Sequence, residues 1–236
     1  DLSFLDPVKD QITFVEGDIL DQDLVSKLVT QHDIDVIVNF AAESHVDRSI
    51  ADSAPFLRTN ILGVQSLIDV LREHEGLRML QVSTDEVYGD IGDDDLPRTT
   101  SDLLVPSSPY AASKAAAEML LMAAMRTYNL PIAISRCTNN FGPHQAEEKF
   151  IPTVIRNALL DQPIPIYAEG KNKRDWLYVT DHTDALEVIL HTDWAFDEHH
   201  IFNVSADDER QNIDVAEMIL DALGKPISRL EFVEDR

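Results

Sequence analysis

The sequence predicts an α/β fold: a doubly wound, mostly parallel β-sheet with helices on both faces, joined to a smaller α/β region. Two patterns indicate this fold. Short continuous apolar runs, typical of strands buried on both faces, alternate along the chain with segments whose apolar residues recur at helical spacing. Because a strand–helix–strand crossover is right-handed and joins parallel strands, this order favours one parallel sheet.

The first half of the chain contains the clearest alternation. Ile12–Glu16 reads as a strand, 22–31 as a helix and Val36–Phe40 as a buried strand. Pro55 fits the first turn of a long helix that extends to Glu75. A strand at 77–82, a helix at 110–128 and a strand at 132–135 complete this part.

The second half is less regular, with prolines and short strands. We expect helices at 150–160, 183–191 and 213–223, and strands at 164–167, 176–179 and 200–203. We interpret residues 1–143 as a partial dinucleotide-binding domain, and residues 144–236 as mainly a substrate-binding region interleaved with the main sheet. No G-x-x-G-x-x-G run is present, so we expect the first strand–helix–strand unit of that domain to be missing.

Composition excludes several classes of function. Nineteen Lys and Arg against 43 Asp and Glu give a net charge of −24, which argues against nucleic acid and anionic lipid as partners. No run of 18 apolar residues could span a membrane. Cys137 is the single cysteine, which rules out an intrachain disulfide and favours a reducing, cytoplasmic location. The eight histidines show no metal-ligand spacing, and we expect no metal.

The segment Ser83–Gly89 follows a predicted buried strand and contains the adjacent acids Asp85 and Glu86. Ligands bind doubly wound sheets beyond the carboxyl ends of the strands, where this segment lies. An isolated Asp-Glu pair is more often a solvated surface turn. Adjacent carboxylates that are partly desolvated raise each other's pKa, and such groups serve as acids and bases.

A second motif favours the catalytic interpretation. Tyr110 and Lys114 lie four residues apart, on one face of a predicted helix, and Tyr110 follows Thr84 by 26 residues. An ammonium near a phenol lowers the phenol's pKa and prepares it as a base. The Y-x-x-x-K spacing alone occurs by chance in many helices, but it gains weight with Thr84 placed after a strand.

Thr84, Tyr110 and Lys114 resemble the Ser/Thr–Tyr–Lys triad of the extended short-chain dehydrogenase/reductase family, in its nucleotide-sugar 4,6-dehydratase branch. The resemblance extends from about residue 12 to the end and is also carried by these segments: Gly17–Ile19, Asn39–Asp47, Ser83–Gly89, Asn139–Pro143, Glu148–Pro152, Arg174–Val179 and Asn212–Val215. It implies a Rossmann-like fold and NAD as cofactor, with dTDP-glucose or a related nucleotide sugar as substrate. Against that family, the chain is expected to be truncated at both ends.

The resemblance implies a role for each catalytic residue. Tyr110 would take the proton of the sugar 4-hydroxyl, Lys114 would hold the cofactor ribose, and Thr84 would hydrogen-bond the reacting oxygen. Glu86 would remove the C5 proton while Asp85 protonates the departing 6-hydroxyl. Epimerases of the same superfamily lack both acids and decarboxylases lack the Asp, so the pair favours dehydration.

Further contacts follow from the same resemblance. The expected cofactor-binding residues are Asp18, Ile19, Phe40, Ala41, Ala42, Glu43, Thr59, Tyr110, Lys114 and Asn140. The expected substrate-binding residues are Ser44, Thr84, Asn139, Lys149, Tyr167, Arg174 and Asn212. Without the resemblance, Asp18 could simply cap a helix and Arg174 could pair with Asp175 on the surface.

Two other functional readings stay open at the level of sequence. One is another NAD-dependent nucleotide-sugar enzyme, an epimerase or a decarboxylase. The other is a catalytically inactive fragment or binding module, which the absent glycine-rich turn favours because that turn anchors the pyrophosphate. The long helices at 55–75 and 110–128 resemble those of a four-helix dimer interface in the family, so we expect a homodimer.

The excess of acids has two interpretations that the sequence weighs about evenly. In the first, a surface of many carboxylates and few lysines is suited to high salt, because screening by salt removes the repulsion between the carboxylates. In the second, the negative charge only keeps an ordinary protein soluble. Melting temperature measured against KCl concentration distinguishes them. A halophilic chain gains stability from low to molar KCl, whereas an unchanged melting temperature contradicts that hypothesis.

Overall fold

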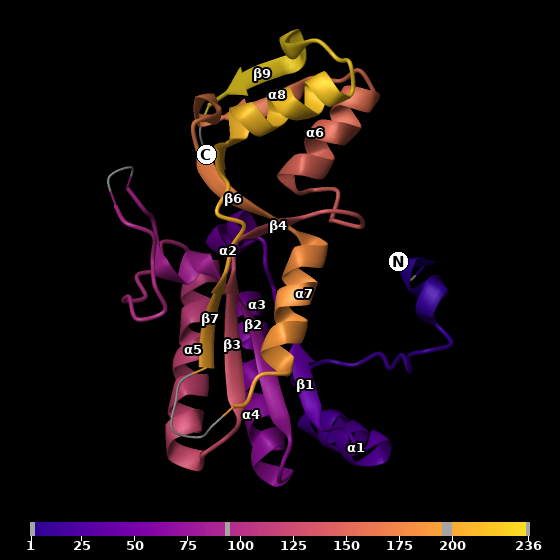
Figure 1. The fold of residues 1–236 in the computed structure, drawn as a ribbon, viewed down its shortest axis with the longest axis vertical. Coiled ribbons are helices and arrows are strands. Elements are labelled where there is room, and N and C mark those ends of the chain that lie inside the picture. The colour runs from indigo at the N-terminus through magenta and orange to yellow at the C-terminus, as the bar shows by residue number, and fades with distance from the viewer. Residues whose placement is uncertain (1–2, 93–94, 195–199, 235–236) are drawn as a thin grey trace. The chain divides into compact units, whose positions relative to one another are not determined.

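The computed structural model describes residues 3–92, 95–194 and 200–234, and its chain divides into two compact units (Figure 1). The first unit comprises residues 1–137 and 186–204, and the second comprises residues 138–185 and 205–236. No helix in the described part of the chain is long and apolar enough to cross a membrane.

A four-stranded, fully parallel sheet forms the centre of the first unit, in the order β1-β2-β3-β7. This sheet confirms the predicted doubly wound α/β class. Its strands are β1 Val36–Asn39, β2 Arg78–Thr84, β3 Ile132–Cys137 and β7 His200–Val204. The helices of this unit are α1 Gln22–His32, α2 Val46–Ala51, α3 Ala54–Phe56, α4 Val64–Glu73 and α5 Pro109–Tyr128.

Helices cover both faces of this sheet. Met79 and Ile132 pack on one face with side chains of α1, α4 and α5, such as Leu121. Leu80 and Ala133, the next residues along the same strands, pack on the opposite face with Leu186, Ile189 and Trp194. Because side chains alternate along a strand, burial on both faces requires apolar residues at successive positions, here Met79–Leu80 and Ile132–Ala133, as the sequence predicted.

Three elements differ from the sequence-based expectation in this unit. The strand predicted at 12–16 is wrong: these residues are exposed and form no strand, since no described strand lies beside them to pair with their backbone. The helix predicted from Pro55 to Glu75 is continuous through α3 and α4 but ends at Glu73, and its middle turn, Leu57–Gly63, is a π-helix. The short helix α2 was not predicted.

The second unit contains two small sheets. One has the order β4-β6-β8 and the other pairs β5 with β9 in parallel. Its strands are β4 Asn139–Phe141, β5 Ile164–Tyr167, β6 Lys173–Tyr178, β8 Glu209–Gln211 and β9 Leu230–Val233. Its helices are α6 Phe150–Leu159 and α8 Asn212–Ala222, while α7 Val179–Leu190 begins in this unit and ends in the first.

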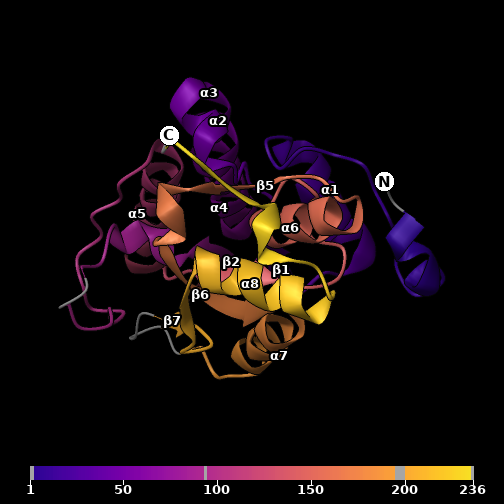
Figure 2. The same ribbon diagram turned by 90° about the horizontal axis from the view of Figure 1, so that it is seen from above.

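The second unit has its own apolar core. Val154 and Ala158 of α6 pack with Ala216 and Leu220 of α8 against the β5 side chain Ile166. Figure 2 shows α6 and α8 side by side. The strand predicted at 176–179 is shifted, because β6 runs from 173 to 178 and α7 begins at 179, while β4, β8 and β9 were not predicted.

Gly89 is the glycine whose replacement the fold tolerates least. Its φ of +78° and ψ of −163° lie in a region that only glycine adopts readily, and a Cβ there would lie 2.0 Å from the Val105 carbonyl oxygen. We expect Gly89→Ala to destabilise the chain by more than the about 1–3 kcal/mol of backbone strain alone, because the clash adds to it. Urea unfolding followed by circular dichroism measures the loss.

Gly76→Ala is the matched control. Gly76 has a similar φ of +85°, but a Cβ there meets nothing within 4 Å. The stability that Gly76→Ala loses should therefore come from backbone strain alone. Equal losses for the two variants would contradict the close approach of Val105 to Gly89.

Candidate active site

The predicted acids lie on a tight turn at the carboxyl end of β2. Thr84 ends the strand, and a 3₁₀-helix, Asp85–Tyr88, follows at once. The Thr84 hydroxyl caps that helix, accepting from the Glu86 amide at 3.3 Å and donating to the Asp85 carboxylate at 3.3 Å. Thr84 is buried, whereas Asp85 and Glu86 are half-buried, so both carboxylates can reach a ligand.

Tyr110 lies at the start of α5, where capping fixes its position. Ser108 is the N-cap and accepts from the Ala111 amide at 3.1 Å, and Pro109 occupies the first turn. The Tyr110 amide donates to the Ser49 hydroxyl at 3.1 Å, which ties the helix start to α2. The phenol ring is buried and meets Phe56 edge-to-face at a centroid distance of 6.4 Å.

The structure brings Tyr110 together with the turn that ends β2. Burial raises the pKa of the Tyr110 phenol, and the nearby Glu86 and Asp85 carboxylates add to this pKa rise. A hydrogen bond with Thr84 acts in the opposite direction and lowers that pKa. The hydroxyl, the two acids and the phenol that the sequence singled out therefore lie around one point at the carboxyl edge of the sheet.

The pKa of Tyr110 differs from the sequence-based expectation. The spacing of Tyr110 and Lys114 predicted a lowered tyrosine pKa, which is wrong for this structure, because burial and nearby carboxylates outweigh any cation. The Lys114 ammonium instead donates to the Val82 carbonyl at 2.8 Å. Burial lowers the pKa of Lys114 to about 8, although Glu118 and Cys137 act to raise it.

The loop after β1, which contains four of the ten predicted cofactor residues, is fixed by a buried amide. Asn60 lies in the π-helix and is 1% exposed. Its side chain accepts from the Glu43 amide at 2.9 Å and donates to the Glu43 carbonyl at 2.9 Å and to the Ser113 hydroxyl at 2.8 Å. Asn60 thus joins the loop to the residue before Lys114.

Sequence reasoning missed Asn60 and chose its neighbour Thr59, which is half-buried on the same π-helix. A polar residue inside an apolar helical run was a signal, and π-turns are frequent at functional sites. Asn39 plays a similar part within β1, donating to Gln81 at 2.9 Å and accepting from the Ala41 amide at 3.1 Å.

Other predicted cofactor residues of the first unit lie before and directly after β1. Asp18 is exposed and accepts from the Leu20 amide at 3.0 Å, within its own turn. Ile19 is half-buried against Gly63, where a Cβ would lie 2.5 Å from its Cδ1. Phe40 is 58% exposed at the end of β1, and the loop continues through Ala41, Ala42 and Ser44.

These residues fit a dinucleotide in two respects. An exposed aromatic ring and small apolar side chains at a strand end offer a surface on which a flat heterocycle can stack. Within the described chain, the Lys114 ammonium makes one hydrogen bond, to Val82, so two of its three donors remain for hydroxyl groups such as those of a ribose.

The remaining predicted residues lie in the second unit. Asn139 and Asn140 are on β4, Lys149 precedes α6, Tyr167 ends β5, Arg174 is on β6 and Asn212 begins α8. Arg174 is exposed, and the Asp175 carboxylate accepts from the Ala206 and Asp207 amides at 3.2 and 3.0 Å. The surface ion pair considered for Arg174 and Asp175 is therefore not formed. Within the described part of the chain, the buried Asn212 Oδ1 has no hydrogen-bond partner.

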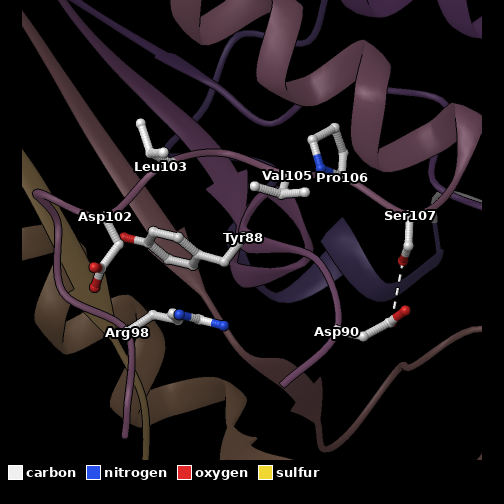
Figure 3. Close-up of a pocket in the computed structure, with 8 residues that line it drawn as sticks. All are labelled: Tyr88, Asp90, Arg98, Asp102, Leu103, Val105, Pro106 and Ser107. Atoms are coloured by element: carbon white, nitrogen blue, oxygen red, sulfur yellow. Dashed lines mark hydrogen bonds between the residues drawn. The ribbon is translucent and has the colours of Figure 1, made fainter. Parts of the chain in front are cut away.

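A pocket of about 560 Å³ lies beside the acid-bearing turn, in the first unit (Figure 3). It is lined by Tyr88, Asp90, Arg98, Asp102, Leu103, Val105, Pro106 and Ser107. Figure 3 shows the Tyr88 hydroxyl pointing toward the end with Arg98 and Asp102, while Ser107 donates to Asp90 at 3.1 Å at the other end. None of the residues predicted for the site lines this pocket.

Comparisons with known proteins agree on one family. The family model described as GDP-mannose 4,6 dehydratase matches residues 4–231. The low-salt glycan biosynthesis protein Agl12 of Haloferax volcanii is 47% identical over 223 residues, which cover 94% of this chain and 70% of Agl12. A dTDP-glucose 4,6-dehydratase of Xanthomonas campestris pv. campestris is 42% identical over 241 residues, covering 94% of this chain and 68% of that protein.

A solved structure is similar over the whole chain. The dTDP-glucose 4,6-dehydratase DesIV of Streptomyces venezuelae, described with NAD and TYD bound, has a TM-score of 0.93 and 39% identity. The match covers 100% of this chain and 72% of DesIV.

The lowered pKa of Lys114 makes stability depend on pH. In the folded chain Lys114 loses its proton near pH 8, against 10.5 for the ordinary side chain. Between these values the unfolded chain binds more protons, so the free energy of unfolding should rise with pH, by about 3 kcal/mol in total. Urea unfolding of wild type and Lys114→Met from pH 7 to 11 measures this, since other groups contribute equally to both.

Lys27→Met, at an exposed position, serves as the control and should follow the wild type. A Lys114→Met variant whose stability changes with pH just as the wild type does would show that Lys114 titrates normally.

Proposed function

This chain belongs to the GDP-mannose 4,6 dehydratase family, and we propose that it catalyses the NAD-dependent 4,6-dehydration of a nucleotide-activated hexose, with dTDP-glucose as substrate. The observation that carries the proposal is the convergence of Thr84, Asp85 and Glu86 on the Tyr110 phenol. The names of the relatives, two of them dTDP-glucose 4,6-dehydratases, support the choice of nucleotide sugar.

The cofactor would be held by the loop after β1, with Phe40 beside a flat ring and Lys114 on the ribose. When bound, NAD supplies the acceptor for the hydride of sugar C4 and the donor of hydride to C6. The similar DesIV structure, which is described with NAD bound, supports this assignment.

Tyr110 acts as the base that takes the proton of the sugar 4-hydroxyl. Because burial raises its pKa, the phenolate needs positive charge nearby when it forms at neutral pH. Lys114, one turn further along α5, is a cation on the same helix. The Thr84 hydroxyl, which hydrogen-bonds the phenol, orients the reacting oxygen.

The two acids on the 3₁₀-helix remove water. Oxidation at C4 acidifies the C5 hydrogen, which Glu86 takes as a proton while Asp85 donates one to the 6-hydroxyl, so that the C6–O bond breaks and water leaves. Glu86 returns its proton to C5 when C6 receives hydride, and proton exchange with solvent restores Tyr110 and Asp85. The half-buried positions of the two carboxylates are compatible with contact between both groups and a bound sugar.

Substrate recognition is assigned to a set of polar side chains. Arg174 offers an exposed guanidinium that can pair with a diphosphate through two parallel hydrogen bonds, and Lys149 adds a second cation. The Asn212 Oδ1, which has no partner within the described chain, is an acceptor for a donor group of the nucleotide. Ser44, Asn139 and Tyr167 complete the proposed set of substrate contacts.

We also propose a homodimer built from the helix of residues 54–73 and α5. Both helices carry large apolar side chains that remain about half exposed: Leu57 49%, Leu62 57%, Met119 50% and Tyr128 48%. Because these side chains are already about half buried, covering the remainder against a second copy gains roughly half of the 1.5–3 kcal/mol of full burial for each, before the cost of association. A cytoplasmic location accompanies the proposal, supported by the single cysteine.

Asp85→Asn should abolish dehydration while sparing oxidation at C4. The amide cannot donate the proton that the leaving hydroxyl needs, and removing such an acid typically lowers the rate about 10²–10⁴-fold. Incubation of the full chain with NAD and dTDP-glucose, followed by the alkali-induced absorbance of the keto sugar, measures the product, while NADH absorbance reports the oxidation.

Asp90→Asn is the matched control, since Asp90 is an exposed carboxylate five residues further on and should leave the rate unchanged. Undiminished formation of 4-keto-6-deoxy sugar by Asp85→Asn would remove the role assigned to Asp85. Absence of NADH and of product in the wild type would refute dehydratase activity in this chain.

Met119→Glu should dissociate the proposed dimer, because a carboxylate at a buried apolar interface loses its hydration. Light scattering after gel filtration should give the mass of two chains for the wild type and of one for the variant. Met218→Glu, at a 53% exposed methionine of α8, should stay dimeric. A wild type with the mass of a single chain would contradict the dimer.

A further inference from the structure

A buried ion pair lies behind the acid-bearing turn. Glu118 of α5 and Arg136 of β3 are 0% and 2% exposed. The Arg136 guanidinium donates to Glu118 Oε2 twice, from Nε at 3.0 Å and from Nη2 at 2.7 Å. Neither residue was singled out by sequence reasoning, and neither belongs to the catalytic set described above.

Burying two charges costs several kcal/mol for each ion, and a well-packed apolar pair is often as stable. Such a pair stabilises the fold only when further hydrogen bonds satisfy the remaining donors and acceptors. Here Glu118 Oε1 accepts from the Ser83 hydroxyl at 2.5 Å, and Arg136 Nη1 donates to the Tyr88 hydroxyl at 2.6 Å. Both oxygens of the Glu118 carboxylate and all three nitrogens of the Arg136 guanidinium therefore have a hydrogen-bond partner.

Those partners lie at the two ends of the turn that bears the acids. Ser83 is the residue before Thr84, and Tyr88 is the last residue of the 3₁₀-helix that begins at Asp85. The Tyr88 hydroxyl in turn donates to Asn203 of β7 at 2.7 Å. The carboxylate thus holds one end of the turn and the guanidinium holds the other, so the ion pair fixes where Asp85 and Glu86 lie.

The same carboxylate also faces Lys114. Glu118 follows Lys114 by four residues, one turn along α5, which places the two side chains on the same face. The charged or titratable groups that act on Lys114 are Glu118 from α5 and Cys137 from β3, and both raise its pKa against the effect of burial.

We propose that Glu118 is a positioning residue: with Arg136 it fixes the acid-bearing turn from behind, and it keeps Lys114 charged. The part that concerns catalysis rests on the proposed function, whereas the effect on Lys114 does not. A purely structural role, as a filler of the core between α5 and β3, predicts a loss of stability and nothing else.

The first experiment measures the protonation of Lys114 directly. Acetic anhydride labels amines in proportion to their unprotonated fraction, so mass spectrometry of the Lys114 peptide against pH gives a midpoint, with exposed Lys27 as internal reference. Glu118→Gln should lower the Lys114 midpoint by about one pH unit, since an opposite charge at close range contributes about 1–3 units. An unchanged midpoint in a folded variant overturns the proposal.

Leu121→Ala is the matched control, because Leu121 is 0% exposed on the same helix and its truncation also destabilises the core. It should lower the melting temperature without moving the Lys114 midpoint. A midpoint that moves as far in Leu121→Ala as in Glu118→Gln would show that loosening α5 suffices, and would also overturn the proposal.

Arg136→Lys separates the two effects. Lysine keeps the positive charge but cannot contact both Glu118 and Tyr88 with a planar fork, so the turn loses one support while the charge near Lys114 is retained. The variant should reduce kcat by about tenfold or more with KM within about twofold, and leave the Lys114 midpoint in place. A normal kcat would refute the positioning of the turn.

If Glu118→Gln fails to fold, the double variant Glu118→Gln/Arg136→Met removes both buried charges and is expected to be tolerated. The same midpoint shift is then required of it, and its absence overturns the proposal. If the wild type lacks dehydratase activity, the proposed function fails, but the labelling midpoint still decides whether Glu118 controls Lys114.

Discussion

The site depends on the parallel register of one sheet. Parallel strands bring their carboxyl ends to the same edge, and in this sheet Thr84 of β2 is the register partner of Cys137 of β3. The turn after Thr84 therefore lies beside the start of α5, where Tyr110 is buried. A one-residue slip of β2 would invert its side chains between the two faces of the sheet and remove Thr84 from the phenol. Positions far apart in sequence thus meet because the strand ends coincide.

Burial determines the charge state of this cluster. The phenol, the ammonium of Lys114 and the Glu118–Arg136 pair are all withdrawn from water, and the phenol and the ammonium respond as desolvation requires. The tyrosine pKa rises and the lysine pKa falls to about 8, so burial shifts both groups toward their neutral forms, while Lys114 stays mostly protonated at pH 7. Burial acts to lower the pKa of Arg136, but the two hydrogen bonds to Glu118 and the charge of that carboxylate raise it overall. We therefore expect the charge of a bound ligand to change the pKa values of the buried groups in this site.

Buried hydrogen bonds position the elements around this cluster. Asn60 joins the Glu43 backbone to Ser113 on α5, while the Ser49 hydroxyl holds the Tyr110 amide. If one of these bonds were absent, a buried polar group would be left unsatisfied, which costs about 1–3 kcal/mol of stability. The π-turn that contains Asn60 packs Gly63 against Ile19, so the helix geometry and the loop geometry depend on each other.

Local patterns in the sequence determined most of the elements and the identity of the acid, phenol and ammonium groups, since apolar periodicity and capping residues such as Ser108 act within a few positions. They could not show that residues 12–16 form no strand, because a strand forms only where a partner strand pairs with it. Nor could they place Glu118 opposite Arg136, or set the sign of the Tyr110 pKa shift. Those outcomes depend on desolvation and on neighbours from other elements, which exist only once β2, β3 and α5 are packed together.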